Sequence, residues 1–267
     1  MRNDADIGKQ LSNAATTLGM IAFSDHGEGK PVVLWPSLFT DHRLYDAMVG
    51  VLAKAGWRTI AIDGPGFSKS DPPAGLVQPE RYADVIIEIA DKLGLSKIAF
   101  AGCSWGGLIG AHLGVCHAER VTSLVLMNTP LLPSHGGHLL ELWGTKLALR
   151  SMASGVAHSM LAPSTVSDPE RLARFTAPFA SFDSGAAAPT VDVTLRHSEG
   201  LEAVLPALQV PTTIMMGEKD TLYSTDTMLL VAKLAPNAKI IIVPDCGHIM
   251  PIEAPEAAVA ALVESPV

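Results

Sequence analysis

The stretch at residues 98–107, IAFAGCSWGG, decides the fold. An apolar run typical of a buried strand ends at a Gly-x-Ser-x-Gly pentapeptide, and a helix-like pattern starts directly after it. We therefore predict a tight strand-to-helix turn that holds Ser104 in a strained backbone conformation. A side chain at Gly102 or Gly106 would collide with the backbone where the strand and the helix nearly touch. Because the motif is short, a glycine-rich turn without chemistry is the alternative.

Length and composition bound the class of protein. The 267 residues leave room for one large α/β domain, and 48% hydrophobic against 17% charged residues is typical of a globular chain. The formal net charge of −8 argues against nucleic acid as a partner, because phosphates require a basic face. It argues equally against an anionic membrane surface. We expect a small-molecule partner, and the sequence leaves the oligomeric state open.

Cysteine content and the N-terminal residues predict the location of the protein. Three cysteines, Cys103, Cys116 and Cys246, cannot all pair, so a reducing compartment fits best. Residues 1–20 lack the apolar core of a signal peptide. No stretch approaches the roughly 18 uncharged apolar residues of a membrane span. We therefore expect a cytoplasmic protein that does not cross a membrane.

Apolar runs alternate with helical patterns along most of the chain. Such alternation predicts a mostly parallel sheet with helices on both faces. The expected strands cover residues 19–24, 31–35, 58–63, 97–101, 121–127, 212–216 and 239–243, and the expected helices cover 45–55, 79–93, 107–116 and 255–262.

Residues 131–208 interrupt this alternation. They contain helical patterns at 139–152 and 169–182 and no convincing strand, and about 80 residues exceed the length that one crossover connection needs. We interpret them as a helical cap, inserted into an α/β core that residues 1–130 and 209–267 form. A set of ordinary crossover helices is the alternative.

Two late segments offer partners for Ser104. A serine hydroxyl is a poor nucleophile until a base takes its proton, and the base needs a carboxylate to orient it. Asp220 follows the expected strand at 212–216, and His248 follows the one at 239–243. Because sites in open parallel sheets gather at the carboxyl ends of the strands, we expect these groups to meet beside Ser104. The chain order Ser, Asp, His agrees with the order expected for this arrangement.

The chain resembles the α/β-hydrolase family in its small esterase and lactonase branch, and is similar to 3-oxoadipate enol-lactonase-like hydrolases. Four motifs carry the resemblance: DGPGFSKS at 63–70, GCSWGG at 102–107, GEKD at 217–220, and GH at 247–248 followed by PIEAP at 251–255. The likeness implies an α/β-hydrolase fold with a mostly parallel sheet and flanking helices. It is more specific for the fold than for a substrate.

Roles for three residues follow from the resemblance. It implies that Ser104 is the nucleophile, that His248 is the general base and then the acid, and that Asp220 is the orienting carboxylate. In some family members the carboxylate follows the strand after the nucleophile instead. That place is held here by Asn128, an amide, which favours Asp220. The competing carboxylates, expected to shape the turn and to face solvent, are Glu218 and Asp245.

The resemblance also implies an oxyanion hole made of two backbone N–H groups. One is assigned to Trp105, directly after the nucleophile, and the other to the loop after the second expected strand. The usual His-Gly pair of that loop is Trp35-Pro36 in this chain. Proline has no N–H, but the donor in relatives is the next residue, so we assign Ser37, with Leu38 as the alternative.

Four residues are candidates for the lining of the substrate pocket. Trp35 and Leu38 belong to the predicted oxyanion loop, whereas Met152 and Phe179 lie in the expected cap. Packing within the cap is the alternative role for the last two. The apolar composition of the cap favours a modest, largely apolar substrate.

Together these observations predict a serine hydrolase that cleaves a carboxylic ester or lactone through an acyl-enzyme, without a cofactor or a metal. Haloalkane dehalogenases and epoxide hydrolases of this fold attack with an aspartate, where this chain has Ser104. The enzymatic alternatives are carbon–carbon bond hydrolysis, amide hydrolysis and perhydrolysis, and Pro36 weighs against the first. A non-catalytic ligand-binding protein is the alternative from another class, and the complete set of serine, aspartate and histidine argues against it.

Overall fold

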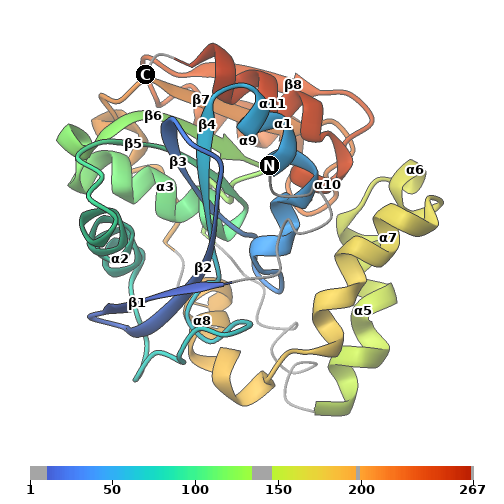
Figure 1. Ribbon diagram of the computed structural model, residues 1–267. Helices are drawn as coiled ribbons and strands as arrows, with labels where there is room; N and C mark the ends of the chain where they lie inside the picture. The colour runs from blue at the N-terminus through green and yellow to red at the C-terminus, as the bar shows by residue number, and fades with distance from the viewer. Residues whose placement is uncertain (1–10, 134–145, 197–198, 266–267) are drawn as a thin grey trace.

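A single mixed sheet forms the centre of the molecule (Figure 1). The computed structural model describes residues 11–133, 146–196 and 199–265. Within them, eight strands follow the order β1-β2-β4-β3-β5-β6-β7-β8. β2 pairs antiparallel with β1 and with β4, and the other neighbours are parallel. The strands are β1 (Ser12–Thr16), β2 (Gly19–His26), β3 (Lys30–Trp35), β4 (Trp57–Ile62), β5 (Ile98–Cys103), β6 (Val121–Met127), β7 (Thr212–Gly217) and β8 (Lys239–Val243).

The central strands are largely apolar and buried because helices cover both faces of the sheet. All six residues of β5 and all six of β7 are buried. Helix α2 packs on α3, which lies against β5 and β6, whereas α1 packs on α11. Figure 1 shows these two helix pairs on opposite faces of the sheet. The helices are α1 (Asp46–Lys54), α2 (Pro79–Lys92), α3 (Trp105–Cys116) and α11 (Pro255–Glu264).

The expected elements of the sheet layers are present, and their bounds differ from the expected ones by at most two residues. The strands β6 and β8 have the expected bounds. Among the elements that we did not expect are β1 and the helix α9 (Thr225–Ala232). The sequence of β1, SNAAT, is polar and small, because this strand lies at the edge of the sheet with most of its side chains outside the core.

Between β6 and β7, the described residues form helices and no strand. These helices are α5 (Lys146–Met160), α6 (Pro163–Val166), α7 (Pro169–Thr176) and α8 (Ser184–Arg196). We call residues 146–196 the helical segment. The helix expected at 139–152 falls partly outside the described residues, and the one expected at 169–182 divides into α7 and the 3-10 turn Ala177–Ala180. Helix α7 contacts α10 (Met250–Glu253), so the helical segment reaches the C-terminal part of the chain.

Candidate active site

Ser104 stands on the sharp turn between β5 and α3. Its φ of +54° lies in the left-handed region, which is costly for a residue with a side chain. The turn is fixed from both sides, because the Ser104 N–H donates to the Met127 carbonyl at 2.8 Å and its carbonyl accepts from Leu108. A Cβ at Gly102 would overlap the Gly106 backbone. Gly102 is therefore a steric requirement of the turn.

Three side chains from distant parts of the chain form one hydrogen-bonded row. His248 Nε2 lies 2.8 Å from Ser104 Oγ, and His248 Nδ1 lies 2.8 Å from Asp220 Oδ2. An ionised carboxylate only accepts hydrogen bonds, so the proton of a neutral imidazole belongs on Nδ1. Nε2 is then free to accept from the serine hydroxyl, which is the geometry a general base needs.

The Asp220 carboxylate is kept ionised although it is buried. Burial raises its pKa, but His248 together with the amides of Asn128 and Leu222 outweighs that effect, and the pKa of Asp220 lies below its usual value. Asn128 Nδ2 donates to Asp220 Oδ2 at 3.0 Å, and the Leu222 N–H donates to Oδ1 at 2.9 Å. The side chain that orients the imidazole is therefore itself held in place.

Asn128 has a supporting position that we did not predict. The sequence placed it after β6, where some relatives carry the carboxylate, but gave no sign of its contacts. In the structure its amide bridges Asp220 and the Gly247 carbonyl, each at 3.0 Å. The competing carboxylates lie apart from this network: Glu218 Oε2 accepts from the Asp245 N–H at 3.3 Å, and both residues are exposed.

The predicted oxyanion loop packs directly against the turn that carries Ser104. A Cβ at Gly106 would overlap the backbone of Trp35, which shows how close the two segments are. The Ser37 carbonyl accepts from both Thr40 N–H, at 3.2 Å, and Thr40 Oγ1, at 2.7 Å. These contacts close the loop into a tight turn. Trp105 begins α3 immediately after Ser104, so both predicted donors belong to segments that meet at the turn.

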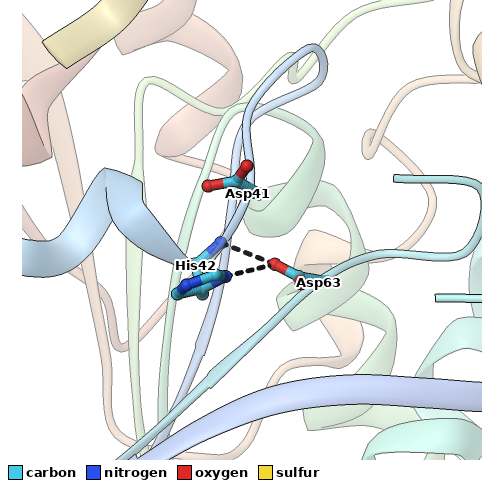
Figure 2. A group of neighbouring side chains, drawn as sticks. All are labelled: Asp41, His42 and Asp63. Atoms are coloured by element: carbon cyan, nitrogen blue, oxygen red, sulfur yellow. Dashed lines mark hydrogen bonds and ion pairs between the residues drawn. The ribbon is translucent and has the colours of Figure 1, made fainter. Parts of the chain in front are cut away.

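Behind this loop, Asp41, His42 and Asp63 form a buried cluster (Figure 2). Asp63 Oδ1 accepts from the His42 N–H at 2.9 Å and lies 2.7 Å from His42 Nδ1. Burial lowers the pKa of His42, but Asp63 outweighs it, and the pKa is raised above its usual value. Asp41 turns to the Arg43 guanidinium, with Nε–Oδ1 at 2.9 Å. The cluster anchors the start of the segment that follows the loop.

Each of the three side chains offers one possible metal-ligand atom, and these atoms lie within 4.8 Å of one another. That spacing would suit a metal ion. Their chemistry fits ion pairs better. The Arg43 guanidinium donates to both Asp41 oxygens, and the raised pKa of His42 favours an imidazolium on Asp63. A metal would need a neutral imidazole. We therefore interpret the cluster as a pair of neighbouring ion pairs.

The structure describes the side chains of three of the four predicted pocket residues. Trp35, Leu38 and Phe179 are buried, whereas the Met152 side chain lies outside what the structure describes. The Phe179 ring stacks on Phe39 of the predicted oxyanion loop, with centroids 6.2 Å apart. A small cavity lies beside Asp220, and none of the predicted pocket residues lines it. The residues that line it are Asn128, Thr129, Leu131, Ile214, Met216, Asp220, Tyr223, Thr225 and Met228.

Comparison with known proteins identifies the family of the chain. A family model described as alpha/beta hydrolase fold matches residues 30–255, and the chain belongs to that family. A curated 2-hydroxy-6-oxononadienedioate/2-hydroxy-6-oxononatrienedioate hydrolase from a Pseudomonas species is 27% identical, over 84% of this chain and 79% of its own length. In the described part of the chain, no helix is long and apolar enough to cross a membrane.

Two solved structures show the same architecture. A thermophilic esterase from Thermogutta terrifontis is 25% identical, with a TM-score of 0.83 over 96% of this chain and 97% of its own. The enol-lactonase from Burkholderia xenovorans LB400 is 23% identical, with a TM-score of 0.85 over 95% and 98%. The predicted resemblance to the α/β-hydrolase fold, with its mostly parallel sheet, is thus confirmed.

Proposed function

We propose that the protein is a serine hydrolase that cleaves a carboxylic ester or a lactone through an acyl-enzyme. The observation that carries the proposal is the buried row from Ser104 Oγ through His248 to Asp220, with both contacts at 2.8 Å. A serine, an imidazole and a carboxylate in this order are the groups that activate a hydroxyl for acyl transfer. The likeness to a solved esterase, 25% identical along nearly the whole chain, supports the same chemistry.

The reaction follows from these contacts. His248 Nε2 takes the Ser104 proton while the serine oxygen attacks the carbonyl carbon, and Asp220 stabilises the imidazolium that forms. Negative charge then develops on the carbonyl oxygen. We assign the stabilisation of this charge to hydrogen bonds from the backbone N–H groups of Ser37 and Trp105. His248 then protonates the leaving alcohol. Water, activated by the same imidazole, hydrolyses the acyl-enzyme and returns the proton to Ser104.

We also propose that the helical segment acts as a cap, within a larger insertion at 131–208 between core portions 1–130 and 209–267. Two contacts tie it to the site. Phe179 stacks on Phe39 of the oxyanion loop, and the Met160 carbonyl accepts from the His248 N–H at 2.6 Å. Side chains of this segment would then face the acyl group, which favours an apolar acyl chain over a charged one.

The test is a panel of esters and lactones that differ in acyl length, assayed with the wild type and with Ser104→Ala. We expect turnover of at least one class in the wild type and its loss in Ser104→Ala, with the fold unchanged by circular dichroism. Ser154→Ala, which changes an exposed serine of α5, is the matched control and should keep full activity. Turnover retained by Ser104→Ala would place the nucleophile elsewhere.

Carbon–carbon bond hydrolysis is the second candidate. It is favoured by the curated relative that matches 84% of this chain, which is named as a 2-hydroxy-6-oxononadienedioate/2-hydroxy-6-oxononatrienedioate hydrolase. Pro36, in place of a flexible glycine-rich loop, weighs against it. Adding a 2-hydroxy-6-oxo-dienoate to the panel separates the two. If that compound is cleaved with a kcat/KM far above the best ester and lactone, the second candidate replaces the first.

A further inference from the structure

Glu253 is a buried carboxylate that the proposed reaction does not use. It ends the short helix α10, is 6% exposed, and accepts three backbone N–H groups. The donors are Gly247 at 3.0 Å, Ile249 at 2.8 Å and Ala162 at 2.7 Å. Gly247 and Ile249 are the two neighbours of His248 in the chain. One carboxylate therefore holds the backbone on both sides of the imidazole.

The third donor comes from a different part of the molecule. Ala162 lies in the joint between α5 and α6 of the helical segment. The same joint bonds to the imidazole's own residue, because the His248 N–H donates to the Met160 carbonyl at 2.6 Å. A Cβ at Gly247 would come within 2.5 Å of the Ala162 nitrogen, so the two backbones are in direct contact.

Burying the Glu253 carboxylate is energetically unfavourable unless hydrogen bonds compensate for it. Burial raises the pKa of Glu253, although the amides of Ala162, Ile249 and Gly247 work against that effect. The three backbone donors belong to two separate segments of the chain, Gly247 and Ile249 to the His248 loop and Ala162 to the α5–α6 joint. The carboxylate therefore joins the His248 loop to the α5–α6 joint.

We propose that Glu253 is a positioning residue that clamps the α5–α6 joint to the His248 loop. The position of the helical segment then determines where the His248 imidazole lies relative to Ser104 and Asp220. This inference rests on the proposed function for its effect on turnover. The clamp itself is a structural claim, and it is testable without any substrate.

Two substitutions at Glu253 weaken the clamp to different degrees. Glu253→Gln keeps an oxygen that can accept from Gly247 and Ala162 but turns an NH₂ group toward the Ile249 N–H. Glu253→Leu removes all three acceptors. We expect kcat, normalised to titrated active sites, to fall about tenfold in Glu253→Gln and about a hundredfold in Glu253→Leu, with KM changing less than about twofold. Partial rescue by the conservative variant is part of the prediction.

Two readouts follow the clamp directly. Proton NMR should show a far-downfield resonance from His248 Nδ1–H on Asp220 in the wild type, weakened in Glu253→Gln and absent in Glu253→Leu. Hydrogen exchange should be faster in both variants in the peptide that contains Ala162. Glu218→Gln is the matched control, because Glu218 is an exposed glutamate that accepts one loop amide, at 3.3 Å. It should resemble the wild type in every measurement.

The outcomes separate the two claims. A resonance and an Ala162 exchange rate unchanged in Glu253→Gln, with the normalised kcat of the wild type, would overturn the clamp. Lower activity caused only by a smaller folded fraction, with the resonance intact, would also overturn it. If Glu253→Leu does not fold, Glu253→Gln decides. Absence of turnover on every substrate, with the resonance lost in the variants, would contradict the proposed function and leave the clamp supported.

Discussion

At the scale of single residues, the site depends on where one proton lies. His248 can accept from Ser104 only if its Nδ1 carries the proton, and the ionised Asp220 at 2.8 Å imposes that tautomer. His248 itself, with Asn128 and the Leu222 N–H, lowers the pKa of Asp220, and these hydrogen bonds fix the orientation of the carboxylate. In the proposed reaction, an ordered series of hydrogen bonds therefore activates the serine, rather than the reactivity of any one group.

Asp220→Asn tests this ordering. The amide can donate to Nδ1 and so favours the wrong tautomer, and we expect kcat to fall by a factor on the order of 10⁴, as for the corresponding change in a serine protease. The measurement is steady-state kinetics on the best substrate of the panel. Asp245→Asn, a change in the exposed loop before His248, should leave kcat unchanged. Near-normal turnover in Asp220→Asn would assign the carboxylate role to another residue.

The lowered pKa of Asp220 also predicts how stability depends on pH. The folded pKa lies below the ordinary value of 3.8, so the carboxylate stabilises the fold above that pH, and this contribution disappears as the pH falls through the folded pKa. Urea unfolding of the wild type and Asp220→Asn should show a stability difference that is constant near neutral pH and shrinks below about pH 4. A difference that grows with acidity would contradict the sign of the shift.

The sequence predicted some of these residues because short motifs identify them. Ser104 lies in a glycine pattern with a steric cause, and Asp220 and His248 follow apolar strands that end at the same edge of the sheet. The role of Asn128 was not predictable, because it depends on the Gly247 carbonyl, 119 positions away. The pairing of His42 with Asp63 likewise joins segments 21 positions apart through a turn that no motif describes.

At the scale of elements, the turn between β5 and α3 is sterically constrained. Gly102→Ala would drive a methyl group into the Gly106 backbone, and we expect a loss of roughly 1–3 kcal/mol in the free energy of unfolding. Gly155→Ala in α5 is the matched control. That position is exposed, and nothing lies within 4 Å of an added Cβ, so we expect a gain of about 0.5–1 kcal/mol. Urea unfolding measures both, and equal effects would contradict the steric account.

Burial made most of the sheet layers predictable, but the helix α9 was missed although Met228, Val231 and Ala232 are buried at helical spacing. The central strands are largely apolar because both of their faces are covered, and they were found within two residues. The edge strand β1 was missed because its SNAAT sequence buries only the middle residue of five. Its pairing with β2 is a matter of backbone hydrogen bonds, which leave little trace in a single sequence.

At the scale of the whole molecule, aromatic side chains join the helical segment to loops that follow strands β3 and β4. Phe179 stacks on Phe39, and Phe182 meets Phe67 edge-on at 5.4 Å. Phe179→Ala should cost about 3–5 kcal/mol, because a buried ring is lost and the contact with the oxyanion loop goes with it. Far- and near-ultraviolet circular dichroism during urea unfolding measures this. A loss below 1 kcal/mol would show that the segment is not held by this contact.

The central claim is that Ser104, His248 and Asp220 form a working nucleophile, and covalent labelling tests it most directly. A fluorophosphonate at low concentration reacts preferentially with a serine hydroxyl that a neighbouring base activates. Peptide mass spectrometry of the labelled, folded protein should find one adduct, on Ser104, and none in Ser104→Ala. A folded wild type that takes up no label, or takes it up at another residue, would contradict the account.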